Sequence, residues 1–196
     1  MQHAVFAFAA LAVALSAQAP PGYYNSVNAS TPATLRTTLH AVIKDHTRFP
    51  YTASSTDTWN ILEQADQSPT TTTQILDVYK NATYAKSGGG NTNYDREHTW
   101  PKSYGFPVEA NSYPHTDCHH LFLCTISWNG ARSNKPYDNG TASWTEWATV
   151  ANAGQGGGSG AFPGNSNWTE SSSSLGAWQT WSSRKGDVAR ALMYMD

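Results

Sequence analysis

Charged side chains are scarce in this chain of 196 residues. Asp, Glu, Lys and Arg make up only 13% of it, with 12 basic and 14 acidic residues, against a usual share of roughly 25%. The formal net charge of −2 provides no global positive field that would attract nucleic acid. Any binding of a polyanion therefore has to be local.

Cysteine is nearly absent, since Cys118 and Cys124 are the only two. Without a second pair, they argue against a structural zinc site. An even count in a secreted chain favours a disulfide. However, one extended strand from 118 to 124 would separate the two Cα atoms by about 20 Å, too far for a bridge. The sequence therefore predicts either a disulfide across a chain reversal or two buried thiols.

Long hydrophobic runs are missing except near the N-terminus. The run from Val5 to Leu15 is too short to span a bilayer, and the small residues Ala17 and Ala19 that follow match a cleavage site. We expect residues 1–19 to be a signal peptide, although no Lys or Arg precedes the run. The alternative is an apolar first helix of the fold. The prediction is a protein exported to the periplasm or the medium, with no membrane segment.

The length suits one domain with a substantial core and is short for two. We expect a single domain over residues 20–196. A helical pattern that stops abruptly at Asp196 predicts that a C-terminal end is missing.

Hydrophobic spacing and turn residues predict a mixed chain of helices and strands. The expected helices cover residues 32–46, 56–65, 124–134 and 187–195. The expected strands lie within residues 73–84, 94–98 and 116–122. The Gly- and Ser-rich stretch 155–174 predicts a surface loop.

The stretch "YDREHTWPKS" places Glu97 directly before His98. A carboxylate can hold a hard cation, and a neutral imidazole can accept a proton. Consecutive strand residues face opposite sides, so both can serve one site only if the strand ends or twists there. Pro101 makes such an end reasonable. The alternative is an exposed glutamate beside a structural histidine.

The stretch "HTDCHHL" gathers His115, Asp117, His119 and His120 around Cys118. Their spacing does not match that of zinc sites. We expect supporting roles instead, in which one histidine packs inward and Asp117 orients a neighbour through a hydrogen bond.

The stretch "SWNGARSN" places Asn129 and Arg132 on one face of a short helix. An amide oxygen can bind a hard metal ion, and a guanidinium can grip a phosphate with two hydrogen bonds. The alternative is a helix end followed by a basic loop.

Together, the three stretches resemble the Glu-His, Asp-x-His-His-Leu and Asn-x-x-Arg-Ser-Asn segments of the bacterial endonuclease I family, in the same order and spacing. Members of this family are secreted or periplasmic nucleases that cleave DNA and RNA without sequence preference, within the ββα-metal (His-Me finger) superfamily. The resemblance covers about residues 35–196. It implies an α+β fold, in which a central ββα-metal finger of strand, loop, strand and helix is surrounded by helices and long loops.

The resemblance also implies roles for single residues. His98 would be the general base, neutral and with its other ring nitrogen donating to a backbone carbonyl. Glu97 and Asn129 would bind one Mg²⁺, with Mn²⁺ or Ca²⁺ as alternatives, and cleavage would leave a 5′-phosphate and a 3′-hydroxyl. Arg132 is expected to grip a phosphate. Further phosphate contacts are expected from basic residues at the rim, namely Arg96, Lys102 and Lys135.

The leading hypothesis is thus an exported, monomeric, Mg²⁺-dependent endonuclease that contacts the phosphate backbone of DNA and RNA. One alternative is a wall- or carbohydrate-binding module that uses its eight tryptophans as stacking platforms. Five of them lie in the C-terminal third, at Trp144, Trp147, Trp168, Trp178 and Trp181. A nuclease homologue without activity is the other alternative. Plasmid digestion distinguishes an active nuclease from both.

Overall fold

The computed structural model describes residues 19–196, so the expected signal peptide, apart from Ala19, lies outside the described residues. The chain divides into two compact units, with the boundary between Thr47 and Arg48. A single domain over residues 20–196 stays a prediction. Within the described range, no helix is long and apolar enough to cross a membrane.

Within residues 19–47, the first unit contains one helix, α1 (Pro32–Ile43). Thr31 caps its N-terminus by accepting a hydrogen bond from the Thr34 amide at 3.1 Å, and proline follows at the first helical position. The helix ends three residues before the expected position 46.

The second unit begins with α2 (Thr58–Ala65), whose N-terminus carries a capping box made by Asp57 and Asn60. Strands β1 (Gln74–Leu76) and β2 (Thr83–Ala85) follow as an antiparallel hairpin. The single strand expected within 73–84 is therefore wrong. The carboxylate of Asp77 accepts a hydrogen bond from the Lys80 amide, and this turns the chain back on itself.

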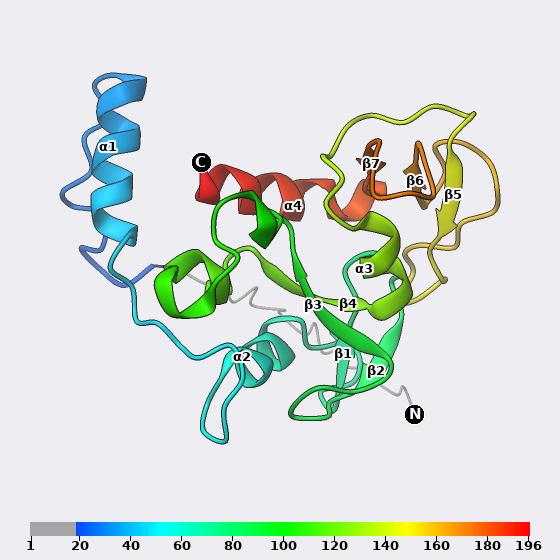
Figure 1. The fold of residues 1–196 in the computed structure, drawn as a ribbon, viewed down its shortest axis with the longest axis horizontal. Coiled ribbons are helices and arrows are strands. Elements are labelled where there is room, and N and C mark those ends of the chain that lie inside the picture. The colour runs from blue at the N-terminus through cyan, green and yellow to red at the C-terminus, as the bar shows by residue number, and fades with distance from the viewer. Residues whose placement is uncertain (1–18) are drawn as a thin grey trace, which may run out of the picture. The chain divides into compact units, whose positions relative to one another are not determined.

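The centre of this unit is a strand–strand–helix succession (Figure 1). Strand β3 (Tyr94–His98) pairs antiparallel with β4 (Leu121–Thr125), and α3 (Ile126–Arg132) follows at once. The β3–β4 connection contains three short 3₁₀ helices, at Lys102–Tyr104, Glu109–Asn111 and Tyr113–Thr116.

The strand expected at 116–122 is wrong in position, because the chain is still turning at its start. The amide of Asp117 donates to the carbonyl of Pro114 at 3.3 Å, which closes the last 3₁₀ turn. The extended segment begins only at Leu121.

Two acidic side chains cover the second edge of β4. The amide of Leu123 donates to Asp66 Oδ2 at 2.6 Å, and the amide of Thr125 donates to Asp77 Oδ2. The amide of Val78 also donates to the Leu123 carbonyl at 3.1 Å. These groups satisfy the strand edge, which would otherwise leave buried backbone donors unpaired.

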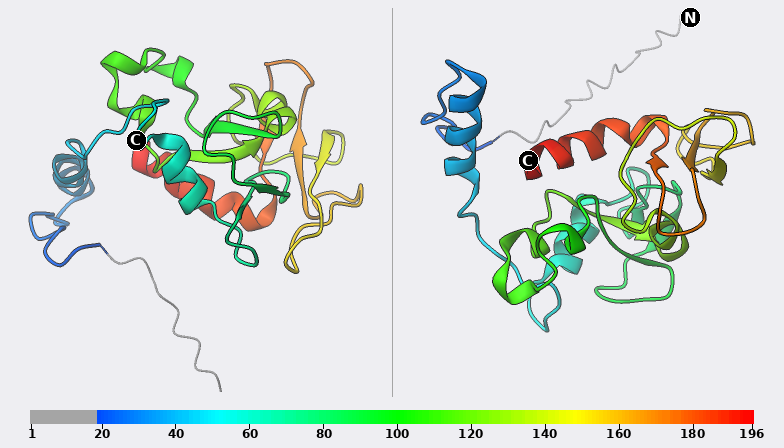
Figure 2. Two further views of the ribbon diagram at one scale, coloured as in Figure 1. Left: turned by 90° about the horizontal axis from the view of Figure 1, so that it is seen from below. Right: turned by 45° about the horizontal axis from the view of Figure 1, so that its top comes forward.

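The C-terminal part forms a three-stranded antiparallel sheet and a long helix. The sheet has the order β5 (Thr145–Ala148), β6 (Ser166–Thr169), β7 (Trp178–Gln179). It lies at one end of the second unit, and the 3₁₀ helices of the β3–β4 connection lie at the other end (Figures 1 and 2). Helix α4 (Ser182–Met195) starts five residues before the expected position 187.

The prediction of a surface loop over 155–174 is wrong for β6. All four residues of β6 are buried. The Asn167 side chain donates to the carbonyls of Tyr79 at 2.7 Å and Trp147 at 3.1 Å. Polar residues of this strand can be buried because their hydrogen bonds are satisfied. The pattern of hydrophobic residues in the sequence does not reveal such hydrogen bonds.

Two hydrophobic clusters form the core on either side of β4. The first comprises Trp59, Leu62, Ile75, Tyr94, Leu121 and Leu123. The second comprises Val78, Tyr79, Cys124, Trp178 and Val188. Trp168, Trp178 and Trp181 are all buried, so they contribute to packing and cannot act as exposed stacking platforms.

The prediction of a disulfide is wrong, because both cysteines are free thiols. Cys118 packs against the first cluster, whereas Cys124 belongs to the second. The two side chains therefore belong to different parts of the core. The alternative of two buried thiols holds for Cys124, whereas Cys118 is only half-buried.

Candidate active site

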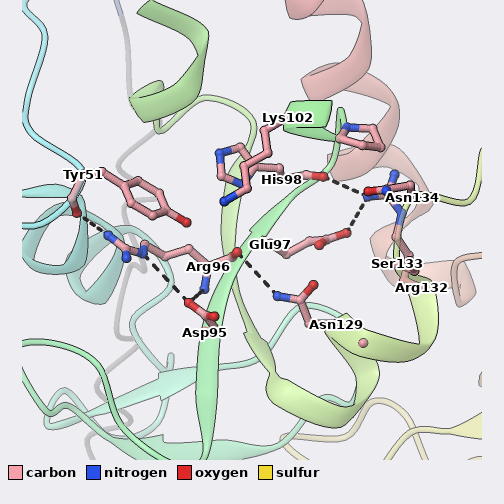
Figure 3. Close-up of a pocket in the computed structure, with 12 residues that line it drawn as sticks. Tyr51, Asp95, Arg96, Glu97, His98, Lys102, Asn129, Arg132, Ser133 and Asn134 are labelled. Atoms are coloured by element: carbon pink, nitrogen blue, oxygen red, sulfur yellow. Dashed lines mark hydrogen bonds and ion pairs between the residues drawn. The ribbon is translucent and has the colours of Figure 1, made fainter. Parts of the chain in front are cut away.

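A pocket opens where β3 ends beside α3 (Figure 3). Strand β3 contributes Glu97 and His98, and the helix contributes Asn129. The strand stops at His98, which allows two consecutive residues to line one pocket. The remaining lining residues are Tyr51, Asp95, Arg96, Pro101, Lys102, Gly130, Arg132, Ser133 and Asn134.

His98 is buried and held in one orientation. Its Nε2 lies 2.9 Å from the carbonyl oxygen of His115, so Nε2 carries the proton and donates it. Nδ1 is then the basic nitrogen, and no partner for it occurs within residues 19–196. Burial lowers the pKa of His98 to about 3, which keeps the free ring neutral at physiological pH.

Glu97 has one engaged and one open carboxylate oxygen. Its Oε1 accepts hydrogen bonds from the Tyr79 hydroxyl at 2.8 Å and from Arg132 Nη1 at 3.0 Å. Its Oε2 has no hydrogen-bond donor in the described part of the chain. Burial raises the pKa of Glu97, while Arg132 and Tyr79 act in the opposite direction.

Asn129 presents an amide oxygen to the same pocket. Its Nδ2 donates to the carbonyl of Arg96 at 3.4 Å, which links α3 to β3. No donor from the described residues reaches its Oδ1, which Figure 3 shows on the side of Glu97.

The donor set fits a hard divalent cation. Glu97 Oε2 and Asn129 Oδ1 are oxygen ligands without a competing donor, and Mg²⁺ is commonly held by one or two protein oxygens plus waters. Across residues 19–196, no group of three or more His, Cys, Asp or Glu residues is arranged to hold a metal. One carboxylate and one amide oxygen are hard donors of the kind that Mg²⁺ takes, whereas structural zinc sites usually have four Cys or His ligands.

Residues 31–196 match the model of the endonuclease I family. This chain belongs to the endonuclease I family. It is 34% identical over 175 residues to a protein of Bacillus subtilis (strain 168) named extracellular ribonuclease, with 88% of this chain and 52% of the relative covered. An extracellular ribonuclease of Bacillus amyloliquefaciens is 32% identical over 176 residues, with the same coverage. The chain spans about half the length of these curated relatives. No solved structure matches.

In this member of the endonuclease I family, the guanidinium of Arg132 is engaged inside the fold. Its side chain is 1% exposed. Nη1 contacts Glu97 and donates to the His98 carbonyl at 2.8 Å, and Nη2 donates to the Thr99 carbonyl at 2.5 Å. The expected phosphate grip is therefore corrected: the guanidinium is used to fix Glu97 and the end of β3.

Two of the three expected rim cations are likewise turned inward. The guanidinium of Arg96 is buried between the rings of Tyr51 and Trp59, 3.4 Å and 4.0 Å from their centroids. Lys135 is 1% exposed and donates to the carbonyl of Ala131. Neither side chain can reach a phosphate at the rim.

Lys102 is the rim cation that the structure leaves accessible. It is exposed and lines the pocket, at the start of the 3₁₀ helix that follows Pro101.

The histidine-rich stretch is divided between two places. His120 is fully buried, donates to the Pro114 carbonyl at 2.7 Å and lies with its ring centroid 5.5 Å from that of His98. Asp117 instead accepts from His119 Nδ1 at 2.9 Å, and His119 borders a different pocket beside α4. Asp117 thus orients a neighbour, as expected, but not one that lines the pocket of His98.

Sequence reasoning missed the tyrosines around this site. Tyr79 donates to Glu97, and its hydroxyl lies 2.5 Å from that of Tyr137. Tyr51 lines the pocket from the segment before α2. Tyr51 and Tyr79 are remote from the quoted stretches in sequence, and Tyr137 lies three residues after Asn134. No local pattern distinguishes any of them from ordinary core aromatics.

Proposed function

We propose that this chain is a secreted, Mg²⁺-dependent endonuclease that hydrolyses phosphodiester bonds of RNA and DNA with little sequence preference. The supporting observation is that Glu97 Oε2, Asn129 Oδ1 and His98 Nδ1 line one pocket without competing donors in a member of the endonuclease I family. The names of the two Bacillus relatives support RNA as a substrate and support export.

His98 acts as the general base in this proposal. Nδ1 removes a proton from a water molecule, whose oxygen forms a bond to phosphorus while the bond from phosphorus to the 3′ oxygen breaks. The 3′ oxygen leaves with the electron pair of that bond and takes up a proton from solvent, so the products carry a 5′-phosphate and a 3′-hydroxyl. The hydrogen bond from Nε2 to His115 fixes the tautomer in which Nδ1 is basic.

A general base needs a pKa near the working pH, and burial alone makes His98 a weak base. A bound phosphodiester places negative charge beside the ring, which raises the pKa of His98 toward the useful range. The substrate therefore activates the base at the moment it is needed.

Glu97 and Asn129 would hold the ion. When bound, Mg²⁺ supplies positive charge that polarises the scissile phosphate and stabilises the charge developing on the 3′ oxygen. Arg132 keeps Glu97 oriented with one oxygen toward the pocket. Backbone-directed contacts of this kind carry no sequence information, which accounts for the low sequence preference.

Digestion of plasmid DNA and of a long RNA, each with Mg²⁺ or with EDTA, tests the proposal. We expect cleavage with Mg²⁺ only, and an Asn129→Ala variant should lose it. His40 is exposed on α1, so His40→Ala serves as the matched control and should keep full activity. Intact nucleic acid with every divalent metal tried would contradict the proposal and favour an inactive homologue or a binding module.

A further inference from the structure

The burial of Arg132 leaves the scissile phosphate without the hydrogen-bond donor expected from the sequence. On the basis of the proposed function, we propose that Tyr51 is a further catalytic residue, whose hydroxyl donates a hydrogen bond to a non-bridging oxygen of the scissile phosphate. Such a donor stabilises the charge that grows on this oxygen in the transition state.

The ring of Tyr51 is held rigidly by its surroundings. One face lies against the Arg96 guanidinium, at 3.4 Å from Cζ to the ring centroid, and Trp59 packs on the other side of the same guanidinium. Arg96 Nη1 also donates to the Tyr51 carbonyl, and the Tyr51 amide donates to Glu109 Oε1 at 2.7 Å. Backbone and ring are therefore both fixed, as a preorganised donor requires.

The hydroxyl of Tyr51 is left open. Within residues 19–196 it has no hydrogen-bond partner, although it belongs to a residue that lines the pocket. Figure 3 shows it directed toward the space beside His98. The ring centroids of Tyr51 and His98 lie 5.7 Å apart, so a phosphate attacked by a water on Nδ1 would be within reach of this hydroxyl.

The protonation state suits a donor. Burial raises the pKa of Tyr51 to about 12, against the lowering effect of Arg96, so the phenol keeps its proton throughout the physiological range. Lys102 Nζ lies 5.6 Å from the ring centroid, which places an exposed cation beside the same wall of the pocket.

The other two tyrosines near the site cannot take this role. The Tyr79 hydroxyl donates to Glu97 Oε1, and the Tyr137 hydroxyl is hydrogen-bonded to that of Tyr79. Tyr51 alone among these three has an unengaged hydroxyl. The arrangement also explains why Arg96 is buried: it is a positioning residue that acts through the Tyr51 ring.

The test compares Tyr51→Phe with the wild type. This substitution keeps the ring and its stacking and removes only the unengaged hydroxyl, so we expect an unchanged melting temperature. We expect kcat to fall by about 100-fold, as for the loss of one oxyanion donor, with a smaller change in KM. Tyr24→Phe, at an exposed tyrosine, is the matched control.

A sulfur substitution locates the hydrogen bond. The substrate is an oligonucleotide with one cleavable linkage flanked by methylphosphonates, prepared as separate Rp and Sp phosphorothioates. The sulfur effect is the cleavage rate of the all-oxygen substrate divided by that of the phosphorothioate. For one diastereomer, this ratio should be about 10-fold larger for the wild type than for Tyr51→Phe, because only the wild type has a hydrogen bond from Tyr51 to lose. Arg96→Lys should lower kcat and also reduce this sulfur effect, because the Tyr51 hydroxyl would no longer be held in place. If Arg96 only stabilised the fold, the sulfur effect would stay unchanged.

The outcomes separate the two proposals. If the wild type does not cleave the all-oxygen substrate, the proposed function fails. If the wild type cleaves and Tyr51→Phe matches it within twofold, or if the sulfur effects of the two proteins are equal for both diastereomers, the role of Tyr51 is wrong and the nuclease function stands.

Discussion

Replacement of Arg132 by methionine should destabilise the protein rather than merely weaken substrate binding. The guanidinium contacts three oxygen atoms inside the fold, namely Glu97 Oε1 at 3.0 Å, the His98 carbonyl at 2.8 Å and the Thr99 carbonyl at 2.5 Å. Arg132→Met removes all three and leaves the Glu97 carboxylate, only 3% exposed, without its counter-charge.

Removing one partner of a buried ion pair costs about 3–5 kcal/mol. A chain of this size has a total stability of roughly 5–15 kcal/mol, so the loss would be a large part of it. Arg190 forms an ion pair with Asp187 at the surface, and its side chain is 73% exposed. Arg190→Met should therefore change the stability by no more than about 1 kcal/mol.

Urea unfolding of both variants at neutral pH, in EDTA, measures the free energies. Adding Glu97→Gln to Arg132→Met should restore part of the stability, because the uncompensated charge is removed. If Arg132→Met costs less than about 1 kcal/mol while cleavage is lost, Arg132 acts on the substrate and the structural assignment is wrong.

Three further predictions concern metal, pH and redox state. Mg²⁺ should raise the melting temperature of the wild type but not that of Asn129→Ala, because a ligand of the folded state stabilises by mass action. Equal increases in the two melting temperatures would show that Asn129 is not a ligand of the metal. Burial raises the pKa of Asp66 to about 7, above an unfolded value of about 4, so this group contributes most stability below pH ~4 and loses it as the pH rises to about 7. The urea midpoint of Asp66→Asn should therefore rise relative to that of the wild type as the pH increases over this range. Midpoints that change in parallel with pH would contradict the raised pKa of Asp66. Dithiothreitol should leave the melting temperature unchanged, since Cys118 and Cys124 are free; a fall of several degrees would indicate a disulfide.

The strand and helix that position the site could be predicted from the sequence because local signals define them. The position of Pro101 indicates that the strand ends near His98, and β3 has the expected bounds 94–98. The spacing of Asn129 and Arg132 places both on α3. A resemblance in three separated stretches supplied the order of these elements.

The directions of the basic side chains could not be predicted in the same way. Whether Arg96 and Arg132 face solvent or the core depends on Tyr51, Trp59 and Glu97, which only the tertiary fold brings to them. A guanidinium suits a phosphate and a buried carboxylate or aromatic ring equally well. Composition and spacing therefore identify the arginines but not their partners.

The β6 strand shows the same limit in a polar segment. Its residues carry little hydrophobic pattern, and they are buried because Asn167 bonds to the carbonyls of Tyr79 and Trp147. These two partners lie 88 and 20 residues away in sequence. Long-range hydrogen bonds of this kind leave no periodic trace.

The central claim is that the imidazole of His98 removes a proton from the attacking water, and chemical rescue tests it most directly. Cleavage of RNA and plasmid DNA in Mg²⁺ should fall by about 10²–10⁴-fold in His98→Gly, and added imidazole should restore part of the rate in proportion to its concentration. Undiminished cleavage by His98→Gly would contradict the account.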